Sequence, residues 1–250
     1  MLTLSLKFRG ALIRRKTRQA DRFVRPMFAA LLLSAACGHA GAQLSRLQSL
    51  LDATPEGGWV KASTGLFSTA FPTGAAAVNV PSYQNPATIV SAWSSFAWDS
   101  ARGDLILFGG GHANYAGNEV YVWDGATGLW SRGSLPSRLD ANNFVVDNAA
   151  PQSSHTYDNS VYLAVNDRFL SFGGAAYQSG GNWATNIGGV ASRAGPWVWD
   201  PSKADSNKVG GTSGSGYAPG SVGGNMWQNR QGQWTGVQAP SFVDGDRLSC

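Results

Sequence analysis

Cysteine and histidine are scarce in this chain. Its 250 residues include two cysteines, Cys37 and Cys250, and three histidines. The segment that precedes Gln43 has the features of an export signal, and its removal leaves one cysteine and two histidines, His112 and His155. One cysteine cannot form an intrachain disulfide, and a zinc site needs three or four ligands close together. We therefore expect no metal site and no cofactor.

Motifs of several large enzyme classes are also missing. The sequence contains no G-x-S-x-G nucleophile elbow, which argues against an α/β-hydrolase, and no phosphate-binding P-loop.

The net positive charge of the chain comes from its N-terminal segment. Residues 1–42 hold eight of the 19 basic residues and one of the 15 acidic residues. The remaining chain has 11 basic and 14 acidic residues, a net charge of −3. It offers no basic patch, so we expect no nucleic-acid partner.

The first 42 residues have the pattern of a secretory signal peptide. A basic stretch is followed by the apolar run Met27–Ala36 and by Ala40-Gly41-Ala42, an A-x-A cleavage site. The apolar run is shorter than the roughly 20 residues that a membrane-spanning helix needs. We expect cleavage after Ala42, a periplasmic or secreted product, and no membrane span in it.

The main positive feature is a pattern that occurs twice. The run Leu105–Phe108 leads into Gly109-Gly110, and an alternating aromatic run, Val120–Trp123, then ends at Asp124. The second copy has Phe169–Phe172, Gly173-Gly174 and Trp197–Trp199, which ends at Asp200. An internal repeat on this scale indicates repeated supersecondary units.

These residues resemble the kelch family of β-propellers. In that family the apolar run is the second strand of a blade, the glycine pair ends it, and an aromatic third strand follows a loop. The loop Gly109–Glu119 is similar to one in bacterial kelch or galactose-oxidase-like proteins of unassigned function. The resemblance implies an all-β fold, here about two four-stranded blades of an incomplete propeller.

Alternating patterns and turn residues give the expected strands. For the first blade they are Ala92–Trp98, Asp104–Gly109, Glu119–Trp123 and a strand that begins at Leu129. For the second blade they are His155–Tyr157, Val161–Val165, Phe169–Gly173 and Trp197–Trp199. One more strand is possible in Met226–Trp234, and Leu44–Leu51 has the spacing of a short helix.

The chain divides accordingly into five segments. They are the signal peptide 1–42, an irregular lead-in 43–90, blades at 91–135 and 151–200, and a Gly/Ser-rich, truncated continuation 201–250. Two blades are too few to close a propeller, which has about four to eight. We expect an exposed blade face and a poorly soluble or oligomeric chain. A small open β-sheet domain is the alternative.

Six aromatic residues of the strands are expected to pack between blades rather than bind a ligand. They are Trp93, Trp98, Tyr121, Trp123, Trp197 and Trp199.

Candidate site residues lie in loops. His112, Asn114, Tyr115, Asn118 and Glu119 follow the first glycine pair, and offer donors, acceptors and a ring on which a sugar could stack. The alternative is that these side chains hold their own loop together.

The second blade adds three candidates. They are His155, which is also compatible with a purely structural place in a strand, Tyr177 and Arg193, a cation suited to a carboxylate.

Three functions stay open from the sequence. The first is an exported propeller module that binds carbohydrate or a protein partner. The second is a carbohydrate-active enzyme of the polysaccharide lyase or oxidase type, with His112 or His155 as base, a loop tyrosine as acid and Arg193 against a uronate. The third is a surface scaffold whose repeats only present loops.

Overall fold

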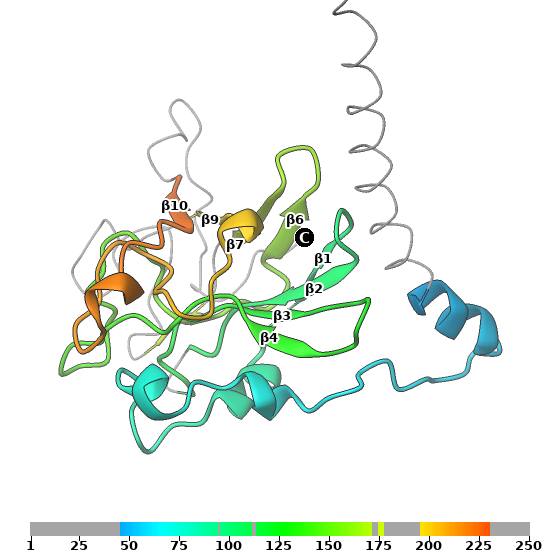
Figure 1. The fold of residues 1–250 in the computed structure, drawn as a ribbon, viewed down its shortest axis with the longest axis horizontal. Helices are drawn as coiled ribbons and strands as arrows, with labels where there is room; N and C mark the ends of the chain where they lie inside the picture. The colour runs from blue at the N-terminus through cyan, green and yellow to red at the C-terminus, as the bar shows by residue number, and fades with distance from the viewer. Residues whose placement is uncertain (1–45, 95, 112–113, 172–174, 178–195, 231–250) are drawn as a thin grey trace, which may run out of the picture. The chain divides into compact units, whose positions relative to one another are not determined.

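Strands dominate the structure. The computed structural model describes residues 46–94, 96–111, 114–171, 175–177 and 196–230. Within these residues the strands form two antiparallel four-stranded sheets and one two-stranded sheet (Figure 1). The expected all-β class is confirmed at this level.

The first sheet is a simple antiparallel meander. Its strands, in spatial order, are β1 (Phe96–Asp99), β2 (Asp104–Leu107), β3 (Tyr121–Trp123) and β4 (Trp130–Arg132). Each lies in or next to its expected segment, because the apolar alternation and the turn residues between the strands are local signals.

The second sheet has the same connectivity. Its spatial order is β6 (Ser160–Leu163), β7 (Arg168–Ser171), β9 (Trp197–Trp199) and β10 (Trp227–Asn229). The fourth strand therefore comes from the segment after residue 200, and the second repeat extends beyond its expected end.

The expectation that His155–Tyr157 begins the second sheet is wrong. Strand β5 (Ser154–His155) instead pairs with β8 (Ala175–Ala176) in a separate two-stranded sheet. Tyr157 has a φ of 48°, and its N–H donates to the carbonyl of Trp93 over 2.6 Å. This left-handed residue ends the extended run and redirects the chain before β6.

The two sheets match residue for residue. Trp123 pairs with Leu105 and Trp130 in the first sheet, as Trp199 pairs with Phe169 and Trp227 in the second. The aspartates that end the two repeats also have the same role, since each accepts backbone N–H groups of the turn that follows it. Asp124 Oδ1 accepts the N–H groups of residues 126 and 127, and Asp200 Oδ1 accepts that of residue 202. Gly173-Gly174 lie outside the described residues.

The main core lies between the two sheets. One face of the first sheet carries the small apolar row Ala97, Ile106 and Val122, whose members pair across strands. This face packs with the aromatic face of the second sheet. The buried members of this core are Ala97, Ile106, Phe108, Val120, Val145, Ala150, Phe169, Trp197, Trp199, Met226 and Trp227.

The lead-in covers part of the opposite face of the first sheet. The 3-10 turns η1 (Phe67–Ala70) and η3 (Pro86–Ser91) place Phe67 and Ile89 in a second core with Tyr121. The ring of Phe67 lies 4.9 Å from that of Tyr121 and 4.8 Å from that of Trp130. Residues 54–90 are therefore irregular apart from their 3-10 turns, and they are also part of the packed fold.

Other 3-10 turns lie in connections: η2 (Gly74–Ala77), η5 (Pro201–Lys203) and η6 (Pro219–Ser221). The expected short helix is present at 46–53. No helix in the described parts of the chain is long and apolar enough to cross a membrane.

The packing expected for the strand aromatics is only partly correct. Trp197 and Trp199 lie in the core between the two sheets, Tyr121 is buried in the second core against the lead-in, and Trp123 is buried as well. Trp93 and Trp98 are 61% and 45% exposed. Trp93 precedes β1 and has a φ of 50°. Trp98 lies on the edge strand β1, whereas η1 of the lead-in contacts β4, the strand at the opposite edge of the sheet.

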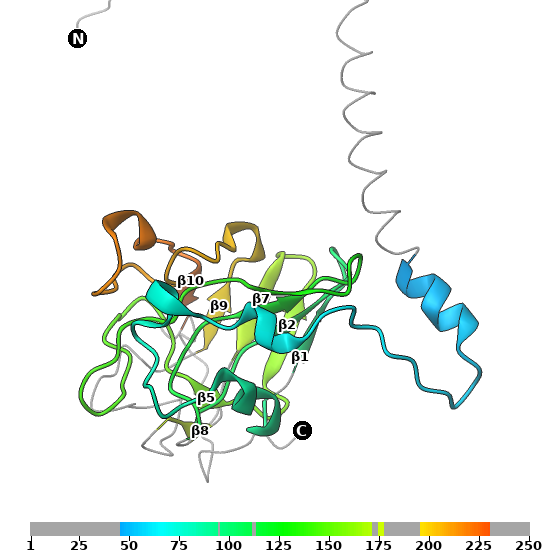
Figure 2. The same ribbon diagram turned by 60° about the horizontal axis from the view of Figure 1, so that its bottom comes forward.

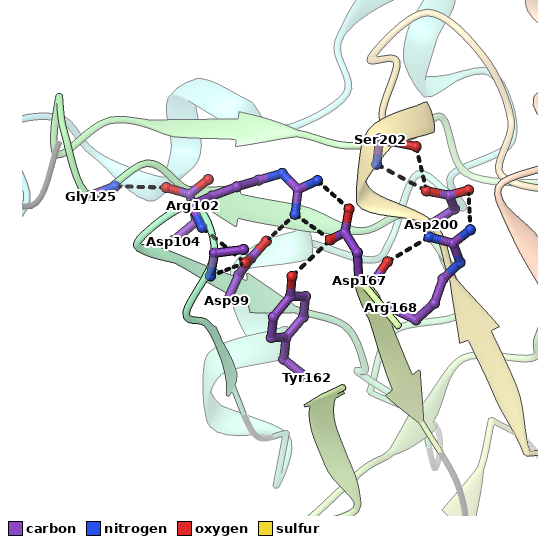
Figure 3. A network of polar contacts seen from close by, with 10 residues as sticks. Asp99, Arg102, Asp104, Gly125, Tyr162, Asp167, Arg168, Asp200 and Ser202 are labelled. Atoms are coloured by element: carbon purple, nitrogen blue, oxygen red, sulfur yellow. Dashed lines mark hydrogen bonds and ion pairs between the residues drawn. The ribbon is translucent and has the colours of Figure 1, made fainter. Parts of the chain in front are cut away.

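Ion pairs join the two sheets at the turns that precede β2 and β7 (Figure 3). The Arg102 guanidinium contacts Asp167 through both of its terminal nitrogens, at 2.6 and 2.8 Å, and Asp99 at 2.8 Å. Tyr162 donates to Asp167 as well, over 2.8 Å. The Arg102 contact holds the pKa of Asp167 at about 2, well below its ordinary value.

Candidate functional site

The candidate site lies at the other end of the first sheet, where β2 runs into three glycines. Gly109 and Gly110 have φ values of +150° and +110°, which side chains rarely allow. At Gly111 a Cβ atom would overlap the backbone of Ser154. Glycine is required here because strand β5 crosses directly over the loop.

Hydrogen bonds fix that crossing. Ser153 Oγ donates to the carbonyls of Gly109 and Tyr115, at 3.1 and 2.7 Å. The Asn114 and Tyr115 N–H groups turn back to the carbonyls of Gly111 and Gly110. The loop after β2 and strand β5 thus form one structure, in which Asn114 lies next to His155.

Four side chains gather at this point, and we name them the Trp93 cluster: Trp93, Asn114, His155 and Tyr157. The imidazole of His155 is nearly buried, and its Nε2 lies 3.0 Å from Asn114 Oδ1. Its ring centroid is 5.1 Å from that of Trp93 and 5.9 Å from that of Tyr157. The cluster presents an exposed indole backed by a hydrogen-bonded imidazole.

Two backbone conformations hold the exposed ring. Trp93 and Tyr157 both have a left-handed φ, which is uncommon for large side chains and carries a conformational cost. The N–H of Tyr157 bonds to the carbonyl of Trp93, so each fixes the other. Strain of this kind is often found at binding sites, where it positions a side chain before the ligand arrives.

The pairing with Asn114 defines what His155 can do. An amide oxygen only accepts, so Nε2 of His155 carries the proton and donates it. In this tautomer the other ring nitrogen, Nδ1, carries no proton. The contact with Asn114 fixes the imidazole in place, which suits a positioned, polar binding surface.

A second group of polar and aromatic residues contacts the same loop. Its members lie just before η3 and directly after β8, the short strand that is labelled with β5 in Figure 2. Gln84 accepts the Ala116 N–H over 2.8 Å and donates to the hydroxyl of Tyr177, which directly follows β8. Tyr177 is buried, and burial raises its pKa. Tyr83 is exposed, and its hydroxyl accepts from Asn143. Tyr177, a candidate binding residue, is therefore buried, and Gln84 links it to the loop.

Tyr115 and Glu119 are fully buried rather than presented to solvent. Glu119 Oε1 accepts hydrogen bonds from Tyr115 at 2.5 Å and from Tyr121 at 2.7 Å. Burial raises the pKa of Glu119 above its ordinary value, and the two tyrosine hydrogen bonds oppose that shift. The expectation that Tyr115 lies outside the packed core is wrong, because the chain from 67 to 89 covers this loop.

Asn118 is also buried and forms a bridge between connections. Its amide donates to Ser137 Oγ and to the carbonyl of Pro151, and it accepts the Ser137 N–H over 2.8 Å. In the described part of the loop, Asn114 is thus the one candidate that reaches the surface. His112 and Arg193 lie outside the described residues.

Sequence reasoning missed Trp93 by assigning it to the strand core. A signal was available, because Trp93 and Trp98 are an odd number of positions apart and cannot share one face of a continuous strand. The contact with His155 could not be read from the sequence, since it depends on the crossing of β5.

The described residues contain no group of three or more His, Cys, Asp or Glu side chains that could hold a metal ion. A hollow of about 300 Å³, lined by Arg138, Val146 and residues 213–215, includes none of the Trp93 cluster. The cluster is an open surface feature. Comparison with known proteins finds no matching family model, curated protein or solved structure.

Proposed function

We propose that this chain is an exported module of the kelch β-propeller type that binds carbohydrate through the Trp93 cluster. The observation that carries the proposal is the exposed Trp93 ring, which lies at a tilt against a nearly buried histidine that Asn114 holds in place. An aromatic face beside amide donors and acceptors is the combination that a sugar ring and its hydroxyls require.

The propeller assignment is supported by the repeat. Two sheets with the same strand order, the same register and equivalent turn aspartates pack face to face, as adjacent blades do. The site lies where the loop after β2 meets β5, and loops carried by a rigid scaffold are the usual place for binding residues. Export is supported by the pattern of residues 1–42.

Binding is favoured over catalysis by the burial of the candidate acid. The tyrosine of the loop that could serve as an acid, Tyr115, is fully buried against Glu119, and His155 is nearly buried beside Asn114. The same arrangement provides a fixed ring and an ordered amide at no cost in reorganisation when a ligand binds.

The test is affinity gel electrophoresis in hydroxyethylcellulose, galactomannan, pectin and alginate. Wild-type protein should be retarded by at least one of them, and Trp93→Ala should bind it about tenfold more weakly or worse. The melting temperature should stay unchanged, because the ring is largely exposed.

Trp59→Ala is the matched control, since Trp59 is fully exposed and should not affect binding. Asn114→Ala should weaken binding too, by releasing His155. The proposal fails if no polysaccharide retards the wild type, or if Trp93→Ala and Trp59→Ala behave alike. Release of reducing or unsaturated ends from the bound polymer would instead indicate an enzyme.

A further inference from the structure

The contact between the two sheets joins two unlike faces. The first sheet contributes its small row, Ala97, Ile106 and Val122, and the second contributes an aromatic row that includes Tyr162, Phe169 and Trp199. In β1 and β6 the key positions are Ala97, which is 3% exposed, and Tyr162, which packs against the same core.

Each sheet also has an outward face, and the repeat register shows what it carries. On the second sheet, Val161, Leu170 and Val198 occupy the positions of the small row. On the first sheet, Trp98, Leu105 and Trp123 occupy the positions of the aromatic row. By register the outward faces therefore repeat the two halves of the contact inside the chain, and the lead-in covers part of the face on the first sheet.

Exposure at these repeated positions is found on the edge strands β1 and β6, whereas Trp123 and Val198 on the inner strands are buried. Val161, the equivalent of the buried Ala97, is 41% exposed, and Trp98, the equivalent of Tyr162, is 45% exposed. Phe96, on the same face as Trp98, is 42% exposed. Large apolar side chains left open on complementary sheet faces mark an interaction surface.

We infer that copies of this chain associate head to tail, with the Val161 face of one second sheet packed on the Trp98 face of the first sheet of another copy. A second copy fits because one chain carries both complementary faces, already matched to each other in shape by the repeat. The contact joins different surfaces, so it is heterologous and leads to a ring or an open filament. The inference rests on the repeat and not on carbohydrate binding.

The new contact should be apolar. Inside the chain the sheets are also joined by Arg102 and Asp167. The equivalent positions on the outward sides are Asn166 and Gly103, which carry no charge. Association should therefore persist in high salt, which screens ion pairs but not hydrophobic contacts.

The test uses the full chain in sedimentation-velocity ultracentrifugation over about 1 to 100 μM. Wild-type mass should rise with concentration. Val161→Glu and Trp98→Glu should each weaken association about tenfold or more by placing a charge in the contact. Val78→Glu is the matched control, because Val78 is a half-exposed valine after η2, outside both sheets, and should leave association unchanged.

Mixing the variants identifies the geometry. Val161→Glu protein keeps an intact Trp98 face, and Trp98→Glu protein keeps an intact Val161 face, so an equimolar mixture should form a one-to-one dimer and nothing larger. A wild type that is monomeric over the whole range, a Val161→Glu variant that associates like the wild type, or a mixture without dimer overturns the inference.

Folding and function are checked separately. Near-ultraviolet circular dichroism should match the wild type for all three variants, and Val161→Gln replaces Val161→Glu if the charged variant does not fold. The two proposals have separate measurements. Ultracentrifugation tests the contact between copies, and affinity electrophoresis of the monomeric Val161→Glu protein tests carbohydrate binding, so either proposal can fail while the other stands.

Discussion

Glu119 is the residue whose role depends most on its surroundings. It lies in a loop of polar residues, yet it is buried under two tyrosines that donate to the same carboxylate oxygen. No hydrogen-bond partner for its other oxygen, Oε2, is found among the described residues. The side chain therefore anchors the loop to β3, and the cost of its burial falls on the ionised form.

Truncation of Glu119 should destabilise the fold strongly. Glu119→Ala leaves two buried hydroxyls without an acceptor and opens a cavity, so we expect a loss of about 3 kcal/mol or more in the free energy of unfolding. Glu119→Gln keeps an acceptor and should cost about 1 kcal/mol or less at neutral pH. Urea denaturation measures both.

The pH dependence of stability tests whether burial penalises the ionised form of Glu119. The pKa of Glu119 is raised in the folded chain. The protonated side chain at low pH therefore carries no penalty, and the folded state loses stability as the pH rises above the pKa of glutamate in the unfolded chain. Glu119→Gln should therefore gain relative to the wild type between about pH 4 and pH 7. A Glu119→Ala variant as stable as the wild type would mean that the tyrosines do not depend on it.

At the scale of elements, the crossing of β5 over the glycine loop creates the candidate site. The crossing needs a close backbone approach at Gly111, and it brings His155 to Asn114 and Trp93. The two-stranded pair of β5 and β8 therefore has a positional role that its length does not suggest.

Gly111→Ala should disturb this crossing. A methyl group there would overlap the Cα of Ser154, so β5 must shift, at a cost of about 1–3 kcal/mol. We expect a lower melting temperature together with weaker carbohydrate binding. Gly220→Ala is the matched control, because a Cβ at that position meets open space. Equal melting temperatures for the two variants would show that the loop tolerates the shift.

At the scale of the whole molecule, a packed core holds the two sheets together, and an ion pair joins them at their edge. The Arg102–Asp167 pair is partly exposed, so its contribution is modest beside that of the buried aromatic face. Its strength, however, depends on pH, because protonation of Asp167 removes the negative charge that pairs with Arg102.

Acid should weaken the link between the sheets. The pKa of Asp167 is lowered to about 2, so its favourable contribution is present above the unfolded value and is lost as the pH falls from about 4 to about 2. After solvent screening we expect about 1 kcal/mol or less. Urea denaturation at both ends of this range should show a smaller acid effect in Asp167→Asn than in the wild type, and equal effects would assign the acid sensitivity to other groups.

The sequence by itself determined the local architecture. Strand alternation located the four strands of the first sheet, and the repeat identified β7 and β9 as the equivalents of β2 and β3. Asp124 and Asp200 could be assigned to turns because their hydrogen bonds reach only two or three residues along the chain. These features depend on neighbouring residues, and a pattern of neighbours is what a sequence displays.

Only the tertiary structure decided which side chains reach solvent. Tyr115 and Glu119 read as loop residues but are buried, while Trp93 reads as core but is exposed. The fourth strand of the second sheet, β10, comes from a segment 27 residues after Asp200. Burial and edge pairing depend on which distant segment covers a face, and that choice is made by packing across the whole fold and not by local pattern.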